Sequence, residues 1–147
     1  MPRGQRETKF PFDRRSVGHV LGLLSARLRA DPVHPTNRIH SIYFDTPGWA
    51  SLEEKRNSDL FKTKVRVRWY ADDRTDEPRG NCFFEVKRRE GGRRTKERIR
   101  TDLSATRLAA SPLGSSLVRE LPRRVLKSLA AGSSLETGSL MPAMEIS

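Results

Sequence analysis

One stretch of the sequence alternates basic and apolar residues with a period of two. It runs from Thr63 to Tyr70 and places Lys64, Arg66 and Arg68 at every second position. Because successive side chains of a strand point to opposite faces, these three side chains would share one face, and the valines and tryptophan between them the other. Arginine binds phosphate oxygens through its planar fork and lysine as a point charge. The stretch therefore predicts a strand with an anion-binding face.

Two later stretches repeat this design. Glu85 and Lys87 alternate with apolar residues in the first, and Lys96 and Arg98 share a face in the second. Like charges opposite one another on paired strands are destabilising, so a polyanion bound among them would explain the pattern. Two architectures remain open. Either the charged faces meet water, the commoner arrangement, or they line an antiparallel barrel whose apolar faces pack outward against helices.

The elements that must position these residues follow from the same periodicities. Asp13 is placed to cap a helix over about residues 14–30, and a short helical excursion is expected over residues 51–55. Gly91 and Gly92 supply a hairpin turn. A helix around residues 117–129 should be interrupted near its start by Pro122. Strands are predicted over residues 5–10, 39–44, 63–70, 81–89 and 93–103, with a further strand starting at residue 144.

The composition restricts the class of protein. The chain has 147 residues, a single domain's length, and a formal net charge of +11. It holds no run of about 20 apolar residues, so no membrane span is expected. One cysteine, Cys82, excludes an internal disulfide framework. With no secretory signal visible, we expect a cytoplasmic protein that binds polyanions.

Four blocks in order resemble the vacuolar transporter chaperone (VTC) domain, a polyphosphate polymerase domain of the CYTH-like triphosphate tunnel metalloenzyme superfamily. The blocks are residues 41–47, 65–70, 84–88 and 96–99, and residues 6–10 are similar to the family's first strand. The similarity is best over residues 5–103. We interpret residues 1–147 as a single VTC-like domain that is truncated at its C-terminus, because the later tunnel strands that the resemblance implies are missing.

The resemblance implies a fold and an activity. The fold would be α+β, an antiparallel β-tunnel with flanking helices, of which this chain holds the N-terminal part. The activity would be transfer of the γ-phosphoryl group of ATP to a polyphosphate chain, with a divalent metal, Mn²⁺ or Mg²⁺. The partners would be ATP and inorganic polyphosphate or triphosphate. No specific nucleic acid is expected, and a membrane-bound partner is left open.

The resemblance also implies roles for single residues. Arg66, Arg68 and Lys87 would be catalytic. Glu7 and Glu85 are the candidates for metal binding, although ion pairing with Lys9 and Lys87 is the favoured role for these carboxylates. The residues implied to bind phosphate are Lys9, Arg66, Arg68, Lys87, Lys96 and Arg98.

Three alternatives stay open at this point. The first is a triphosphate hydrolase of the same superfamily, whose first strand usually carries Glu-x-Glu-x-Lys, whereas this sequence has Gln5 in place of the first glutamate. The second is a polyphosphate-binding domain without turnover. The third is a basic nucleic-acid-binding module, although the usual aromatic and helical signatures of such modules are absent from the sequence. Whether this chain is itself an enzyme is left open.

Overall fold

The computed structural model describes residues 10–29, 32, 36, 38–128 and 140–146. The chain divides into two compact units, Met1–Thr36 and Asn37–Ser147. In the first unit a 3₁₀ turn, Arg14–Ser16, leads into helix α1, Val17–Ser25. Asp13 caps this segment as predicted, since its carboxylate accepts a hydrogen bond from the Arg15 amide at 2.7 Å. The predicted strand over residues 5–10 lies outside the described residues, except for Phe10.

Helix α1 is shorter than the sequence predicted. It ends at Ser25, where the serine hydroxyl donates to the carbonyl of Gly22 at 3.0 Å. Hydroxyl side chains that bond to the local backbone compete with continued helical pairing. The prediction of a helix as far as residue 30 was therefore wrong in its C-terminal end.

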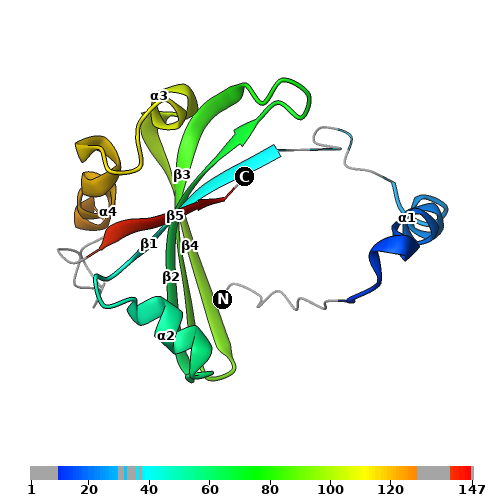
Figure 1. Cartoon of the computed structure of the whole chain (residues 1–147), viewed down its shortest axis with the longest axis horizontal. Coiled ribbons are helices and arrows are strands. Elements are labelled where there is room, and N and C mark those ends of the chain that lie inside the picture. The colour runs from blue at the N-terminus through cyan, green and yellow to red at the C-terminus, as the bar shows by residue number, and fades with distance from the viewer. Residues whose placement is uncertain (1–9, 30–31, 33–35, 37, 129–139, 147) are drawn as a thin grey trace. The chain divides into compact units, whose positions relative to one another are not determined.

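The second unit is built on one antiparallel sheet of five strands in the order β4-β3-β2-β1-β5 (Figure 1). The α+β class is confirmed, and the sheet is open, with β4 and β5 at its edges, as is consistent with a tunnel-like fold. Strand β3 begins three residues before its predicted start, which shortens the loop before it. The strands are β1, Arg38–Asp45; β2, Phe61–Ala71; β3, Pro78–Glu90; β4, Arg93–Ser104; and β5, Met141–Ile146.

In the part of the chain that the structure describes, three helices accompany the sheet. Helix α2, Ala50–Arg56, connects β1 and β2 where the sequence predicted a short excursion. Helices α3, Ala105–Ala109, and α4, Ser116–Ser128, follow β4 and lie together on one side of the sheet (Figure 1). Helix α3 was not predicted; it begins where the Ser104 hydroxyl accepts a hydrogen bond from the Arg107 amide at 3.2 Å.

Helix α4 runs through Pro122 without the predicted interruption. A proline inside a helix loses one backbone hydrogen bond and crowds the preceding turn. Here the Pro122 side chain is fully buried, and its neighbours Val118 and Leu121 belong to the core. Burial of this apolar surface offsets the lost hydrogen bond. The sequence of the segment alone does not show that Pro122 is buried, so the interruption was predicted.

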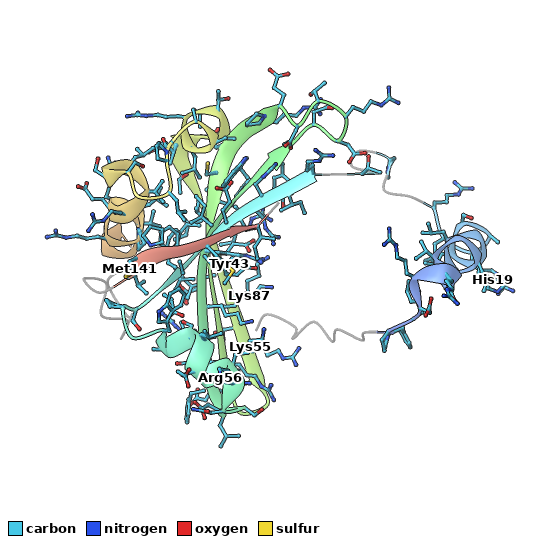
Figure 2. All side chains as sticks on the ribbon, in the orientation of Figure 1. His19, Tyr43, Lys55, Arg56, Lys87 and Met141 are labelled. Carbon is cyan, nitrogen blue, oxygen red and sulfur yellow. The ribbon has the colours of Figure 1, made fainter. Side chains whose placement is uncertain are left out.

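The core lies between the sheet and these helices. Trp69 and Phe84 from the central strands are buried there together with Leu108 of α3 and Val118 of α4. The alternating residues point to the opposite face, as the period-two pattern predicted. Figure 2 shows Tyr43 and Lys87 extending from that second face, away from α3 and α4. Helices α3 and α4 thus cover the apolar face and not the charged face.

Candidate phosphate-binding face

The charged side chains form rows that cross the sheet, because paired residues of neighbouring strands lie side by side. In the middle row Arg66 pairs in register with Glu85, and Glu85 with Arg98. On one side of it a second row contains only lysines. Because the family resemblance implies that its cations bind phosphate, we call the surface formed by these rows the phosphate-binding face. It is defined by Lys64, Arg66 and Arg68 of β2, Glu85 and Lys87 of β3, and Lys96 and Arg98 of β4.

Glu85 lies at the centre of this face. Its side chain is 0% exposed, although it points away from the apolar core. The Arg66 guanidinium donates from Nε to Glu85 Oε2 at 2.7 Å, and Arg66 Nη2 lies 2.5 Å from the same oxygen. Lys96 Nζ lies 3.1 Å from Oε1 and Arg98 Nε 3.6 Å from it. One buried carboxylate therefore holds three cations in place.

The titration of this cluster follows from its contacts. Burial alone would raise the pKa of Glu85, but the hydrogen bonds and charges of Arg66 and Lys96 lower it further than burial raises it. For Arg66, burial lowers the pKa, yet the hydrogen bonds to Glu85 and Tyr43 give a net rise. Both shifts favour the charged forms, the carboxylate of Glu85 and the guanidinium of Arg66.

Two tyrosine hydroxyls each accept a hydrogen bond from one further nitrogen of an arginine. Arg66 Nη1 donates to the Tyr43 hydroxyl at 3.0 Å, and Arg98 Nη2 donates to the Tyr70 hydroxyl at 3.0 Å. Arg98 also lies over the Phe83 ring, with Cζ 3.9 Å from the ring centroid. Such a cation–π contact holds a guanidinium without neutralising it. Both arginines are therefore oriented while retaining their charge.

The paired positions of the second row that the structure describes are all lysines, and one of them, Lys96, reaches Glu85 of the middle row. Lys64 pairs in register with Lys87, and Lys87 with Lys96. Burial lowers the pKa of Lys87, and the charges of Arg66, Lys96 and Arg68 lower it more than Glu85 raises it. Like charges opposite one another on paired strands are destabilising. An anion placed over Lys87 would relieve this repulsion.

Arg68 completes the face on the other side of the middle row. Its Nε donates to the Ser41 hydroxyl at 3.3 Å, and within the described part of the chain it forms no ion pair. Its guanidinium therefore keeps donors for a ligand. Arg68 and Lys87 flank the central Arg66–Glu85 pair. Together with Lys64 they are the cations of the face that no carboxylate of the described residues contacts directly.

The residues described do not fit a metal ion by themselves. Among them, no group of three or more histidine, cysteine, aspartate or glutamate side chains could hold one. Divalent cations such as Mg²⁺ and Mn²⁺ take several oxygen ligands. The face offers Glu85, whose two oxygens are already contacted by Arg66, Lys96 and Arg98. Glu7, the other residue implied, lies outside the described residues.

The sequence model of the VTC domain matches residues 4–128 of the chain. The chain belongs to the VTC domain family. Comparisons with curated proteins and with solved structures gave no match. The match covers the four strands that precede β5 and the helices that follow β4, and it includes every residue of the phosphate-binding face.

The structure of this VTC domain gathers five of the six residues implied to bind phosphate on one face. These are Arg66, Arg68, Lys87, Lys96 and Arg98, whereas Lys9 lies outside the described residues. The favoured pairing of Glu85 with Lys87 was wrong. Glu85 binds Arg66, Lys96 and Arg98 instead, because the register places Arg66 and Arg98 directly beside it on both neighbouring strands.

Three residues that hold the arginines were missed as site residues. Tyr43, Tyr70 and Phe83 were not predicted to take part in phosphate binding. Tyr70, Phe83 and Tyr43 lie two positions from Arg68, Glu85 and Ser41, respectively, so the period-two alternation places them on the charged face. This spacing could have identified them from the sequence. The register that brings Phe83 and Tyr70 to Arg98 could not be read from the sequence, since β2 and β3 shift register between Arg68 and Tyr70.

No helix among the residues that the structure describes is long and apolar enough to cross a membrane.

Proposed function

We propose that the phosphate-binding face binds inorganic polyphosphate and the triphosphate of ATP, and that this VTC domain transfers the γ-phosphoryl group of ATP to a polyphosphate end. The observation that carries the proposal is the row of Lys64, Lys87 and Lys96, which are set directly opposite one another and of which Lys96 alone contacts a carboxylate of the described residues, that of Glu85. Such a row lowers the stability of the free protein. A linear phosphate chain carries the negative charge that would neutralise it.

The proposed reaction needs no nucleophilic side chain. A terminal oxygen of the polyphosphate attacks the γ-phosphorus, the bond from that phosphorus to the β–γ bridging oxygen breaks, and ADP leaves. Catalysis of phosphoryl transfer rests mainly on positioning and on neutralising charge at the transferred group. Arg66, Arg68 and Lys87 would position the transferred group and neutralise its charge. Glu85 orients Arg66, whereas Arg68 and Lys87 are contacted by no carboxylate of the described residues.

Glu85 would act as a positioning residue. It holds Arg66, Lys96 and Arg98 at fixed places and leaves their outward nitrogens free of it. Arginine and lysine side chains lose much conformational entropy when they bind a ligand. Because the ion pairs restrict Arg66 and Arg98 before a ligand arrives, part of that loss is already incurred on folding.

Incubation with ATP labelled at the γ-phosphate, with a polyphosphate primer and with or without Mn²⁺, tests the proposal. A ladder of labelled polyphosphate is the expected product. Release of labelled phosphate without chain growth would indicate the hydrolase alternative. Saturable binding without turnover would indicate the non-catalytic alternative.

A pair of variants matched in charge locates the activity. Arg66→Ala/Arg68→Ala removes two cations from the phosphate-binding face. Arg123→Ala/Arg124→Ala removes two exposed cations from α4, which packs on the opposite face. Loss of the ladder in the first variant and its retention in the second is the expected result. Equal loss in both would refute the assignment of the reaction to this face.

A further inference from the structure

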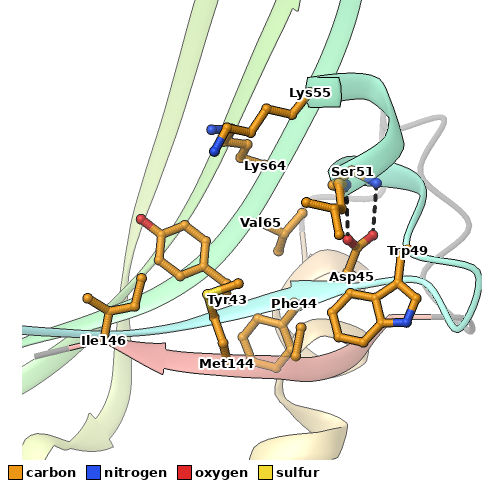
Figure 3. Close-up of a pocket in the computed structure, with 12 residues that line it drawn as sticks. Tyr43, Phe44, Asp45, Trp49, Ser51, Lys55, Lys64, Val65, Met144 and Ile146 are labelled. Atoms are coloured by element: carbon orange, nitrogen blue, oxygen red, sulfur yellow. Dashed lines mark hydrogen bonds between the residues drawn. The ribbon is translucent and has the colours of Figure 1, made fainter. Parts of the chain in front are cut away.

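A pocket of about 240 Å³ lies where β1, β2, β5 and helix α2 meet (Figure 3). Its walls combine flat and flexible apolar side chains with two cations. The side chains that matter for its chemistry are Tyr43, Trp49, Leu52, Met144, Lys55 and Lys64. Aromatic and apolar walls with a few placed polar groups are typical of small-molecule sites.

Trp49 lines this pocket in an unusual conformation. Its backbone is left-handed, with a φ of 57°, which is rare for a bulky side chain. The Asp45 carboxylate fixes the turn around it by accepting hydrogen bonds from the amides of Thr46, Ser51 and Leu52 at 2.8, 2.9 and 3.2 Å. Nevertheless the Trp49 side chain is 46% exposed. Core burial therefore does not explain this conformation, and the exposed indole ring is accessible to a ligand.

Other apolar side chains face the same space. Met144 of β5 is 46% exposed and Leu52 of α2 is 40% exposed, and both line the pocket. Methionine adapts its shape and makes favourable contacts with aromatic rings. An aromatic ring of a ligand could thus be held between the indole of Trp49 and these side chains.

The two lysines connect the pocket to the phosphate-binding face. Lys55 and Lys64 extend toward the side of the pocket on which the Tyr43 hydroxyl lies (Figure 3). Neither lysine forms an ion pair within the part of the chain that the structure describes. Lys64 is also the first lysine of the row that continues to Lys87. The negatively charged part of a ligand in the pocket could therefore extend from Lys64 along that row.

We propose that this pocket binds the nucleobase and ribose of a nucleoside triphosphate, with the base stacked on Trp49 and the phosphates directed past Lys55 and Lys64. The inference rests on the proposed function and adds the orientation of the nucleotide to it. The nucleoside lies at the α2 corner of the sheet, and the γ-phosphate is farthest from this corner. Inorganic phosphate chains use the same cations but leave the pocket empty.

Calorimetric titration of the whole chain with ATP and, separately, with inorganic tripolyphosphate tests this orientation. Stacking of one base on an aromatic side chain changes affinity by about tenfold or more. Trp49→Ala should weaken ATP binding by about tenfold and leave tripolyphosphate binding within about twofold. Trp49→Phe keeps an aromatic ring and should retain most of the ATP affinity. Leu60→Ala, an exposed apolar residue outside the pocket, is the control and should change neither titration.

The outcomes separate the pocket from the proposed function. An equal loss of ATP and tripolyphosphate affinity in Trp49→Ala, or no loss of either, would overturn the pocket assignment. Failure of the unaltered chain to bind tripolyphosphate would refute the proposed function. If ATP still bound that chain and lost affinity in Trp49→Ala, the pocket assignment would stand alone. Absence of binding of both ligands would overturn both.

Discussion

Glu85 decides the electrostatics of the phosphate-binding face at the scale of single residues. A face of lysines and arginines alone would repel itself strongly, and a face neutralised by many carboxylates would not bind an anion. Glu85 contacts Arg66, Lys96 and Arg98 and leaves Lys87 and Arg68 without such a contact. The carboxylate therefore reduces the repulsion among the cations, and the face keeps a net positive charge.

Glu85→Gln should destabilise the protein by about 3 kcal/mol, because it leaves buried cations without their counter-charge. The value is at the lower end for such pairs because Lys96 is half-exposed. Unfolding in urea measures it. Glu97→Gln is the control, since Glu97 pairs with Arg88 at a more exposed place and its loss should cost about 1 kcal/mol or less. Equal losses in the two variants would contradict the central role of Glu85.

Because of Lys87, the affinity for tripolyphosphate should fall as the pH rises. The pKa of Lys87 is lowered from its ordinary value of 10.5 by burial and by Arg66 and Lys96. A bound anion stabilises the protonated amine and raises that pKa, so the affinity should fall as pH rises through the lowered pKa. Titrations between neutral pH and about pH 10 would show the fall.

Lys87→Arg is the matched variant for this test. Arginine keeps its charge throughout this range, so the fall in affinity should disappear or move to higher pH. An unchanged profile in Lys87→Arg would show that another group is responsible.

The turn between β1 and α2 is the element on which the pocket depends. Asp45 is buried, and its carboxylate accepts three backbone amides of this turn. Asp45→Ala should cost about 1–2 kcal/mol of stability, as the loss of a capping carboxylate does. It should also reduce the ATP affinity more than the tripolyphosphate affinity, because Trp49 loses its fixed position. Urea unfolding and the two titrations measure these effects, and an equal change in both affinities would separate the turn from the pocket.

The strands were predictable from the sequence, whereas the contacts between them were not. Alternation places Lys64, Arg66 and Arg68 on one face regardless of what surrounds the strand, so that prediction is local and was confirmed. The partners of Glu85 depend on the register of three strands, which is set by contacts far apart in the sequence. Pro122 shows the same limit for helices, since only the buried core around it explains why α4 continues.

At the scale of the whole molecule, labelling of Cys82 can be used to monitor unfolding. Its side chain is buried in the core, and burial raises the pKa of the thiol to about 12. Because the thiolate is the reactive form, a thiol reagent should label the native protein only through unfolding. Labelling should therefore slow when tripolyphosphate is added, since a ligand that binds the folded state lowers the unfolded fraction. Prompt labelling of the native protein would contradict the buried position of Cys82.

The central claim is that the charged face of the sheet binds a linear phosphate chain. Calorimetric titration with tripolyphosphate at physiological salt, beside a single-stranded RNA of matched charge, tests it most directly. Arg68→Ala, which breaks no ion pair of the described residues, should weaken tripolyphosphate binding about tenfold, and Arg66→Ala/Arg68→Ala about a hundredfold. Arg123→Ala/Arg124→Ala should leave it unchanged. Stronger binding of RNA that collapses with added salt and is indifferent to Arg66 and Arg68 would contradict the claim.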